Sequence, residues 1–176
     1  VCASVEKPSQ HPFAQAVVKA AAQQGQTPFP VEQFEVIAGG GVRARWRGRW
    51  IFGASEAFAA RQATLPAGLK TQAAHWAEQG KTPFWIGEEM RILGVLALSA
   101  PLRPSACPAV QTLQKMGLKV CLLTGDNART AHAVAQQAGI QTVYAGVLPQ
   151  GKEEILRRLQ SQGETVAVVG DGINDA

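Results

Sequence analysis

The chain has 176 residues, a formal net charge of +4 at pH 7 and a hydrophobic content of 46%. These values are typical of one large or two small globular domains with a packed core. They are not those of a membrane span, because no apolar run approaches the ~18–20 residues needed to cross a bilayer. Residues 1–7 also lack the plan of a signal peptide.

Three widely spaced cysteines, Cys2, Cys107 and Cys121, form no C-x-x-C pair. This pattern supports neither a zinc site nor a disulfide framework, and it indicates a reduced, cytosolic setting. The mild positive charge is compatible with an anionic ligand but does not by itself indicate nucleic acid. The chain has no initiator methionine and stops inside an acidic loop, so we expect a piece of a longer protein.

The first helix is expected to begin at Pro12, directly after Ser9-Gln10-His11. Proline fits the first position of a helix, and apolar residues then recur at helical spacing until Gly25. A histidine at such a helix start is ordinarily a cap or a surface residue.

A glycine-rich bend is predicted between two strand-like segments, residues 34–38 and 42–53. The spacing Gly39-x-Gly41-x-x-Ala44 formally matches the dinucleotide fingerprint, but that fingerprint requires a helix to follow it. Strand-like alternation follows instead, with a turn expected near Arg47-Gly48, so the Rossmann interpretation of this bend fails. Such a bend can still admit a flat ring or a phosphate close to the backbone.

Basic and aromatic residues alternate between Arg43 and Trp50. The arginines occupy odd positions and the tryptophans even ones, so a continuous strand would place the two kinds on opposite faces. Basic residues between aromatic ones can bind nucleic acid. The alternative that we favour is an edge hairpin with one solvated basic face.

Two helices and a hairpin complete the first half, over residues 55–62, 67–79 and 83–98. Together with the preceding strands they predict an α+β domain with an antiparallel sheet. The character of the sequence changes between residues 93 and 104, and we place the two domains at residues 1–96 and 97–176.

The second half alternates helices and strands. The expected helices span residues 105–116, 128–138 and 152–160, and the expected strands span 118–123, 142–144 and 165–169. This alternation predicts right-handed βαβ units and a parallel sheet, in which Thr165–Val169 would be a strand buried on both faces. The overall fold class is therefore α/β.

All three aspartates of the chain lie on two strand-end loops, residues 124–127 and 170–176. The first loop offers hydroxyl, carboxylate and amide groups beside a helix start, which is an anion-binding position. The second loop offers two carboxylates, and hard oxygen ligands of this kind suit Mg²⁺ shared with a phosphate. The alternative is that Asp and Gly simply make good turns. Lys152, near the next helix start, is either a solvated lysine or a cation for a phosphoryl group.

Taken together, these stretches resemble the cytosolic ATP-binding region of heavy-metal-transporting P-type ATPases. Thr124-Gly125-Asp126 is similar to the family's TGD motif, and Gly170–Asp175 to its Mg²⁺-binding hinge motif. Leu148-Pro149 followed by Lys152 is similar to the segment of the phosphate-contacting lysine. Ser9-Gln10-His11-Pro12 resembles the SEHP motif of the heavy-metal branch, and Gly39, Gly41 and Gly53 resemble its nucleotide-domain glycines.

The resemblance implies a nucleotide-binding domain over residues 1–96 and the C-terminal part of a phosphorylation domain over residues 97–176. The latter would be an incomplete haloacid-dehalogenase-like (Rossmann-type) domain at the cytoplasmic face of a membrane pump. The implied residues are Gln10, His11, Gly39, Gly41 and Gly53 for ATP, Thr124, Asp126 and Lys152 for phosphoryl transfer, and Asp171 and Asp175 for Mg²⁺. The implied partners are ATP and the rest of the same pump, namely the strand with the phosphorylated aspartate, the actuator domain and the membrane domain. No nucleic acid is expected, and copper is the favoured metal.

The sequence also departs from the family pattern. The family's glutamate before the histidine is Gln10 here, the asparagine after the strand glycine is Ala54, and the aspartate that opens the second half is Ala100. The phosphorylated aspartate of the D-K-T-G-T motif is absent, and the resemblance places it upstream of Val1. The chain alone is therefore expected to bind nucleotide without catalysing ATP hydrolysis.

Two other functions are compatible with parts of the sequence. One is a fragment of a soluble haloacid-dehalogenase-superfamily phosphatase, against which the S-x-H-P motif and the long first domain argue. The other is a nucleic-acid-binding module that uses the Arg43–Trp50 segment, whose affinity would fall steeply with salt.

Overall fold

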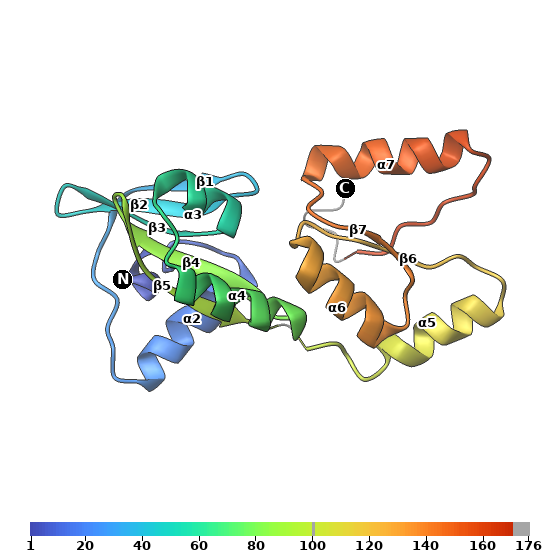
Figure 1. The fold of residues 1–176 in the computed structure, drawn as a ribbon, viewed down its shortest axis with the longest axis horizontal. Helices are drawn as coiled ribbons and strands as arrows, with labels where there is room; N and C mark the ends of the chain where they lie inside the picture. Colours follow the sequence, from blue (N-terminus) through green and yellow to red (C-terminus); the bar gives the residue numbers. More distant parts are fainter. Residues whose placement is uncertain (100, 171–176) are drawn as a thin grey trace. The chain divides into compact units, whose positions relative to one another are not determined.

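The structure, a computed structural model, describes residues 1–99 and 101–170. The chain divides into two compact units, residues 1–100 and 101–176 (Figure 1). The boundary follows the last strand of the first sheet, so residues 97 and 98 belong to the first unit. No helix within the described residues is both long and apolar enough to cross a membrane.

The first unit contains a five-stranded antiparallel sheet whose strands follow one another in chain order. The strands are β1 (Glu32–Ile37), β2 (Gly41–Trp46), β3 (Arg49–Ala54), β4 (Thr82–Glu88) and β5 (Arg91–Leu98). Arg47 and Gly48 join β2 to β3 with φ angles of 50° and 77°, as a tight two-residue hairpin requires. The predicted antiparallel sheet and the predicted turn are both confirmed.

Two helices cover one face of this sheet, which we call the α3–α4 face. They are α3 (Glu56–Gln62) and α4 (Ala67–Glu78), and they pack around Phe52 and the fully buried Trp85. The two helices lie between β3 and β4 in the sequence, so one connection between neighbouring strands supplies both helices that cover this face (Figure 1).

The opposite face, the α1–α2 face, carries α1 (Cys2–Glu6) and α2 (Pro12–Gln23). Val5 of α1 is fully buried against a cluster that includes Ile51 of β3. Neighbouring residues Ile51 and Phe52 thus point into different cores. Because both faces are covered, β3 reads as a continuous apolar run rather than as an alternating one.

No element was predicted for residues 1–7, where the structure has α1. A helix of five residues is too short to show a helical repeat in the sequence. Tertiary contacts stabilise it, since Val5 is buried and the buried Ser4 hydroxyl accepts a hydrogen bond from the Phe29 N–H at 3.1 Å.

Over residues 101–170, the second unit contains two parallel strands and three helices. They are α5 (Ala106–Lys115), β6 (Cys121–Leu123), α6 (Ala128–Ala138), β7 (Thr142–Tyr144) and α7 (Pro149–Ser161). The Asn127 side chain caps the N-terminus of α6, and Gly139 ends that helix in the left-handed conformation. The predicted βαβ unit with a parallel strand pair is confirmed, although β6 is shorter than residues 118–123.

The predicted strand Thr165–Val169 is wrong. These residues have no regular secondary structure, and Val168 and Val169 are 54% and 97% exposed. A strand needs a neighbour for its backbone hydrogen bonds, and among the described residues the second sheet contains only β6 and β7. The β-branched run has the propensity for a strand, but propensity alone does not order it.

Replacing Gly41 by alanine is expected to lower the free energy of unfolding of the first unit by about 2–4 kcal/mol. A Cβ at Gly41 would lie 2.2 Å from the Gly53 carbonyl oxygen and 2.7 Å from Ala54 Cα, and its φ of +129° already disfavours a side chain. Gly48→Ala is the matched control, because Gly48 also has a positive φ but a Cβ there meets nothing within 4 Å. That variant should lose only about 1 kcal/mol.

Urea unfolding followed by tryptophan fluorescence measures both variants, since all four tryptophans lie in the first unit. Equal losses in Gly41→Ala and Gly48→Ala would show that the backbone contact at Gly41 contributes nothing.

Candidate functional site

Three of the predicted ATP-binding glycines come together at one end of the β2–β3 pair. The turn from β1 to β2 contains Gly39, and Gly41 opens β2 directly opposite Ala54 of β3. Ser55 fastens the turn to β3, because its N–H donates to the Gly40 carbonyl at 2.7 Å and its hydroxyl to the Gly39 carbonyl at 3.3 Å. The glycines therefore let two backbone segments approach more closely than side chains would permit.

Gly53 lies on β3 one residue before this contact, on the α1–α2 face. A Cβ at Gly53 would lie 2.6 Å from Phe84 Cε1 and 3.3 Å from the Glu6 Oε1 atom. The ring of Phe84 therefore leaves no room for a side chain at position 53. Because Gly53 has none, the Glu6 carboxyl faces the backbone of β3.

Glu6 is a residue of this site that the sequence analysis missed. It is 5% exposed, and burial raises the pKa of its carboxyl to about 7. Burial accounts for this shift by itself, with no contribution from a hydrogen bond to the carboxyl within residues 1–99 and 101–170. Its sequence signal was weak, since it is one acidic residue after a short apolar segment. A buried carboxyl without a donor is nonetheless a marker of a functional site.

Cys2, on the same short helix, is a chemically quiet neighbour. Burial, followed by the charge of Glu6, raises the pKa of its thiol to about 12. The thiolate that would bind a metal or attack an electrophile is therefore disfavoured.

Gln10 and His11 are exposed and lie in the loop between α1 and α2. His11 is the N-cap of α2, where its Nδ1 atom accepts a hydrogen bond from the Phe13 N–H at 3.2 Å. Its ring also lies 5.2 Å from the ring of Phe13. Because α1 and α2 both pack on the α1–α2 face, the loop between them belongs to the same side of the sheet as Glu6 and Gly53.

A second polar cluster lies at the carboxyl end of β6. The Thr124 hydroxyl donates to Asp126 Oδ2 at 3.2 Å and accepts from the Asp126 N–H at 3.1 Å. Asn127 Oδ1 accepts from the Thr130 N–H at 3.1 Å, which caps α6. These bonds fix the loop before any ligand binds.

Backbone hydrogen bonds join this loop to the one that follows β7. The Gly146 N–H donates to the Asp126 carbonyl at 2.7 Å, and the Val147 N–H donates to the Thr124 carbonyl at 3.0 Å. The second loop leads into α7, whose first turn contains Lys152. Thr124, Asp126 and the start of α7 therefore share the carboxyl edge of the two parallel strands, where ligands of α/β folds bind.

The predicted Mg²⁺ ligands, Asp171 and Asp175, lie outside the described residues. Within residues 1–99 and 101–170, no group of three or more His, Cys, Asp or Glu side chains is arranged to hold a metal. In the part of the chain that the structure describes, the carboxylate of the phosphoryl-transfer cluster is that of Asp126, which is engaged with Thr124.

The arginine-rich segment differs from the expected edge hairpin. β1 pairs with β2 and β4 pairs with β3, so the β2–β3 hairpin lies inside the sheet and not at its edge. Trp50 is paired with Arg45 across the ladder, so the two side chains share a face instead of lying on opposite ones. The Arg43 guanidinium lies 4.5 Å from the centre of the Trp50 ring, and that of Arg45 lies 5.5 Å away.

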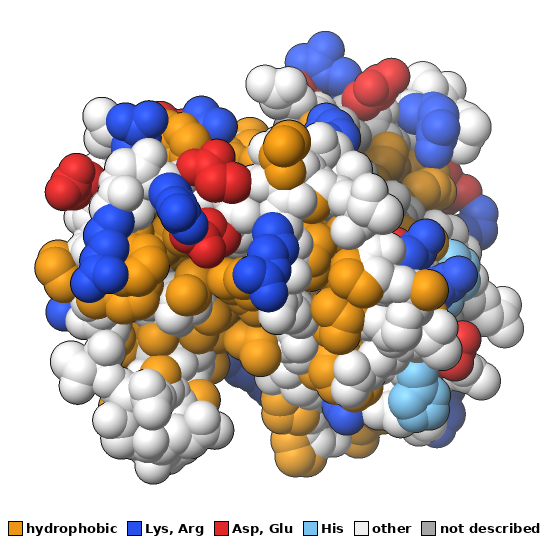
Figure 2. Space-filling model, turned by 60° about the vertical axis from the view of Figure 1, so that its left-hand side comes forward, with side chains coloured by type: hydrophobic (Ala, Val, Ile, Leu, Met, Phe, Trp, Pro, Cys, Tyr) orange, Lys and Arg blue, Asp and Glu red, His pale blue; other side chains and the backbone are white. Residues whose placement is uncertain are grey.

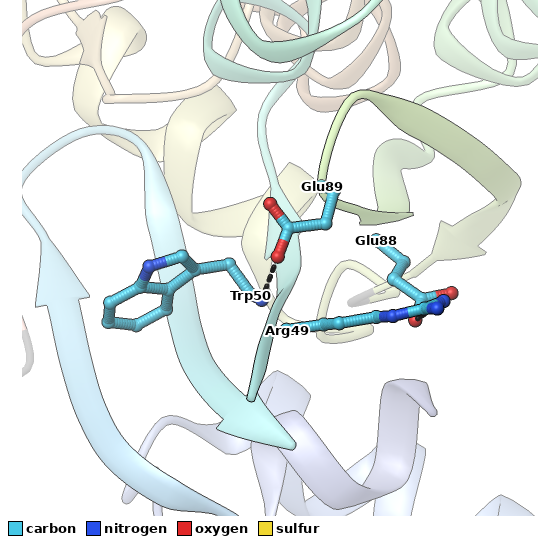
Figure 3. A network of polar contacts seen from close by, with 4 residues as sticks. All are labelled: Arg49, Trp50, Glu88 and Glu89. Carbon is cyan, nitrogen blue, oxygen red and sulfur yellow. Dashed lines mark hydrogen bonds and ion pairs between the residues drawn. The ribbon is translucent and has the colours of Figure 1, made fainter. Parts of the chain in front are cut away.

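Acidic side chains accompany these arginines. Arg43 forms an ion pair with Glu35 at 2.7 Å, and Arg49 one with Glu88 at 3.3 Å. The exposed Glu89 instead reaches back to β3, where its carboxylate accepts a hydrogen bond from the Trp50 N–H at 2.6 Å (Figure 3). Figure 2 shows basic and acidic side chains side by side over hydrophobic surface rather than an all-basic stripe.

Comparison with known proteins agrees with this architecture. The family model for haloacid dehalogenase-like hydrolases matches residues 1–176. The chain therefore belongs to the haloacid dehalogenase-like hydrolase family.

Among curated proteins, the chain is 42% identical over 177 residues to the probable copper-exporting P-type ATPase V of Mycobacterium tuberculosis. It is 40% identical over 174 residues to copper-transporting ATPase 2 of Rhizobium meliloti. These alignments cover 100% and 99% of the chain but 23% and 21% of the relatives, so the chain spans less than a quarter of their length.

Solved structures give the same result. The catalytic domain of the CPx-ATPase CopB-B matches with a TM-score of 0.73 and 25% identity, over 99% of this chain and 60% of that one. A zinc-transporting PIB-type ATPase in its E2.Pi state matches with a TM-score of 0.55 and 31% identity, over 99% and 28%. The resemblance to heavy-metal-transporting P-type ATPases is confirmed, as is the mixed α/β fold class.

Glu6→Gln is expected to flatten the pH dependence of stability of the first unit. The pKa of Glu6 is about 7 in the folded protein and ordinarily 4.5, so the folded state holds the proton more tightly. The stability of the wild type should be greatest below pH 4.5 and fall as the pH rises through 7. Between pH 4.5 and pH 8 the wild type should lose about 1–2 kcal/mol of its free energy of unfolding through this group. The variant should not show this loss, because glutamine stays neutral.

Urea unfolding of both proteins across this pH range provides the measurement. Glu78→Gln, an exposed change on α4, is the matched control and should behave as the wild type. A wild type and a Glu6→Gln variant with parallel pH profiles would show that Glu6 does not titrate in this range.

Proposed function

We propose that this chain is the ATP-binding portion of a heavy-metal-transporting P-type ATPase, with copper as the favoured metal. In that pump, ATP would phosphorylate an aspartate, and hydrolysis of the aspartyl phosphate would drive the ion across the membrane. The observation that carries the proposal is the cluster of Gly39, Gly41 and Gly53 beside the buried Glu6 carboxyl. The curated relatives named as copper pumps support the choice of metal.

The first unit would act as the nucleotide-binding domain. Its glycines give access to backbone N–H and carbonyl groups, which can bind the polar edge of a base. The Glu6 carboxyl can accept a hydrogen bond from an amino group of the base, and this donor would satisfy a group that is buried without one. His11 and Gln10, exposed at the start of α2, would contact the nucleotide from the adjoining loop.

The second unit would supply part of the phosphoryl-transfer site. The Thr124 hydroxyl and the Lys152 ammonium group would contact the transferred phosphoryl group, and the Asp126 carboxylate holds the Thr124 hydroxyl in place at 3.2 Å. Mg²⁺, held by Asp171 and Asp175, would neutralise charge that develops during transfer. The three aspartates of this chain all have other roles in this scheme, so the phosphorylated aspartate would belong to another part of the pump. The chain by itself should therefore be inactive as an ATPase.

The remaining parts of the pump would be the partners of this chain. They include the strand with the phosphorylated aspartate, the actuator domain and the membrane domain, and they place both units at the cytoplasmic face. The arginine-rich hairpin does not favour a nucleic-acid interface, because Glu35 and Glu88 pair with two of its arginines.

ATP should produce saturable NMR shifts at the amides of residues 11, 39, 41 and 53. His11→Ala is expected to weaken binding about tenfold, since a loss near 1.4 kcal/mol is typical of one lost polar or stacking contact. His75→Ala is the matched control, because His75 is an exposed histidine on α4 of the same unit, and its ring is hydrogen-bonded to the C-cap residue Gln79. Its affinity for ATP should equal that of the wild type.

A folded first unit without shifts at these amides would contradict the proposal. Equal weakening by His11→Ala and His75→Ala would remove His11 from the site while leaving ATP binding in place.

A further inference from the structure

One large apolar side chain near the glycine cluster is left outside every core. Val36, in the edge strand β1, is 72% exposed. Phe34, two residues earlier on the same strand, is packed against the cluster around Val5 and Ile51. Ile37, the last residue of β1, still packs against the core of the α3–α4 face, so Val36 is uncovered on the α1–α2 face alone.

The strand register shows what this valine faces. Val36 is paired with Val42, Val42 with Gly53, and Gly53 with Ile86, across four neighbouring strands. Directly paired residues of an antiparallel sheet have their side chains on the same face. Val36 is therefore the outermost member of a row on the α1–α2 face, the face on which the Glu6 carboxyl lies against Gly53.

The row has a particular chemistry. Val42 and Ile86 are each 6% exposed, and Gly53 between them has no side chain. These three positions therefore offer a ligand little apolar side-chain surface. The outer end of the row at β1 is the apolar side chain of Val36, which adjoins the turn that contains Gly39. A polar ligand group gains nothing from such a surface, whereas a flat heteroaromatic ring can bury it.

We infer that Val36 is the apolar wall against which the base of the nucleotide packs, and that it contacts the ring but not the phosphates. This inference rests on the proposed function. It assigns base affinity to two separate features, namely hydrogen bonds from the glycine–Glu6 cluster and hydrophobic contact with Val36.

The test compares the affinities of adenosine and ATP for the wild type and for Val36→Ala, measured by calorimetry or NMR titration. Removing two methyl groups that a ligand half-covers should raise Kd about three- to fivefold. The increase should be the same for adenosine and for ATP, because the two ligands share only the nucleoside. Val36→Ile keeps a β-branched apolar side chain and should bind within about twofold of the wild type.

Met90→Ala is the matched control, because Met90 is 84% exposed and lies at the β4–β5 turn. It should leave both affinities unchanged. Unfolding curves of the variants establish that each first unit is folded, and Val36→Ile retains strand propensity if alanine weakens β1.

Several results would overturn the inference. If Val36→Ala binds adenosine as tightly as the wild type does, Val36 does not contact the base. A loss of affinity for ATP alone would also overturn the inference, since it would put Val36 against the phosphates. A wild type that binds neither ligand would overturn the proposed function together with the wall. Binding by the wild type with no effect of Val36→Ala would leave the proposed function intact.

Discussion

The close approach of two backbone segments, where Gly41 of β2 meets Gly53 and Ala54 of β3, is the constraint on which the first unit depends. No side chain fits at Gly41, and the ring of Phe84 takes the space that a side chain at Gly53 would need. The same contact fixes the turn through Gly39, because Ser55 can then hydrogen-bond to it from the end of β3. The absence of side chains at Gly41 and Gly53 therefore lets β2 and β3 approach each other and also leaves their backbone accessible.

The buried carboxyl of Glu6 depends on this arrangement. A side chain at position 53 would crowd it, and a fully packed sheet face would leave it no room. A carboxyl buried without a hydrogen-bond donor costs stability at neutral pH, and folded proteins retain such groups mainly where a ligand or a reaction uses them. This cost and the missing side chains lie at the same place, so the glycine cluster is a candidate binding site and not only a packing solution.

The parts of the fold that were predictable from the sequence have local causes. Pro12 begins α2, residues 128–138 form α6, and the turn at Arg47 and Gly48 lies where the glycine indicated it. The failures have non-local causes. Residues 165–169 have the composition of a strand, but no described strand pairs with them. α1 has almost no local signal and is stabilised by burial of Val5.

The residues of the candidate site also fall into those that the sequence could predict and those that it could not. Glycines and histidine at characteristic spacings could be found from the sequence, and so could the loop with Thr124 and Asp126. Glu6 could not, because its importance comes from its position against Gly53, a residue 47 positions later in the printed sequence. The relation between Arg45 and Trp50 also depends on the fold, since a two-residue turn puts both side chains on one face where a continuous strand would separate them.

Ala3 near the start of the first unit and Leu98 at its end pack in the same small cluster. One small apolar cluster, to which Val17 of α2 also belongs, therefore links α1 at the start of the unit to the end of β5, its last strand. Loss of either α1 or the end of β5 would expose this cluster, so the first and the last element of the unit should unfold together.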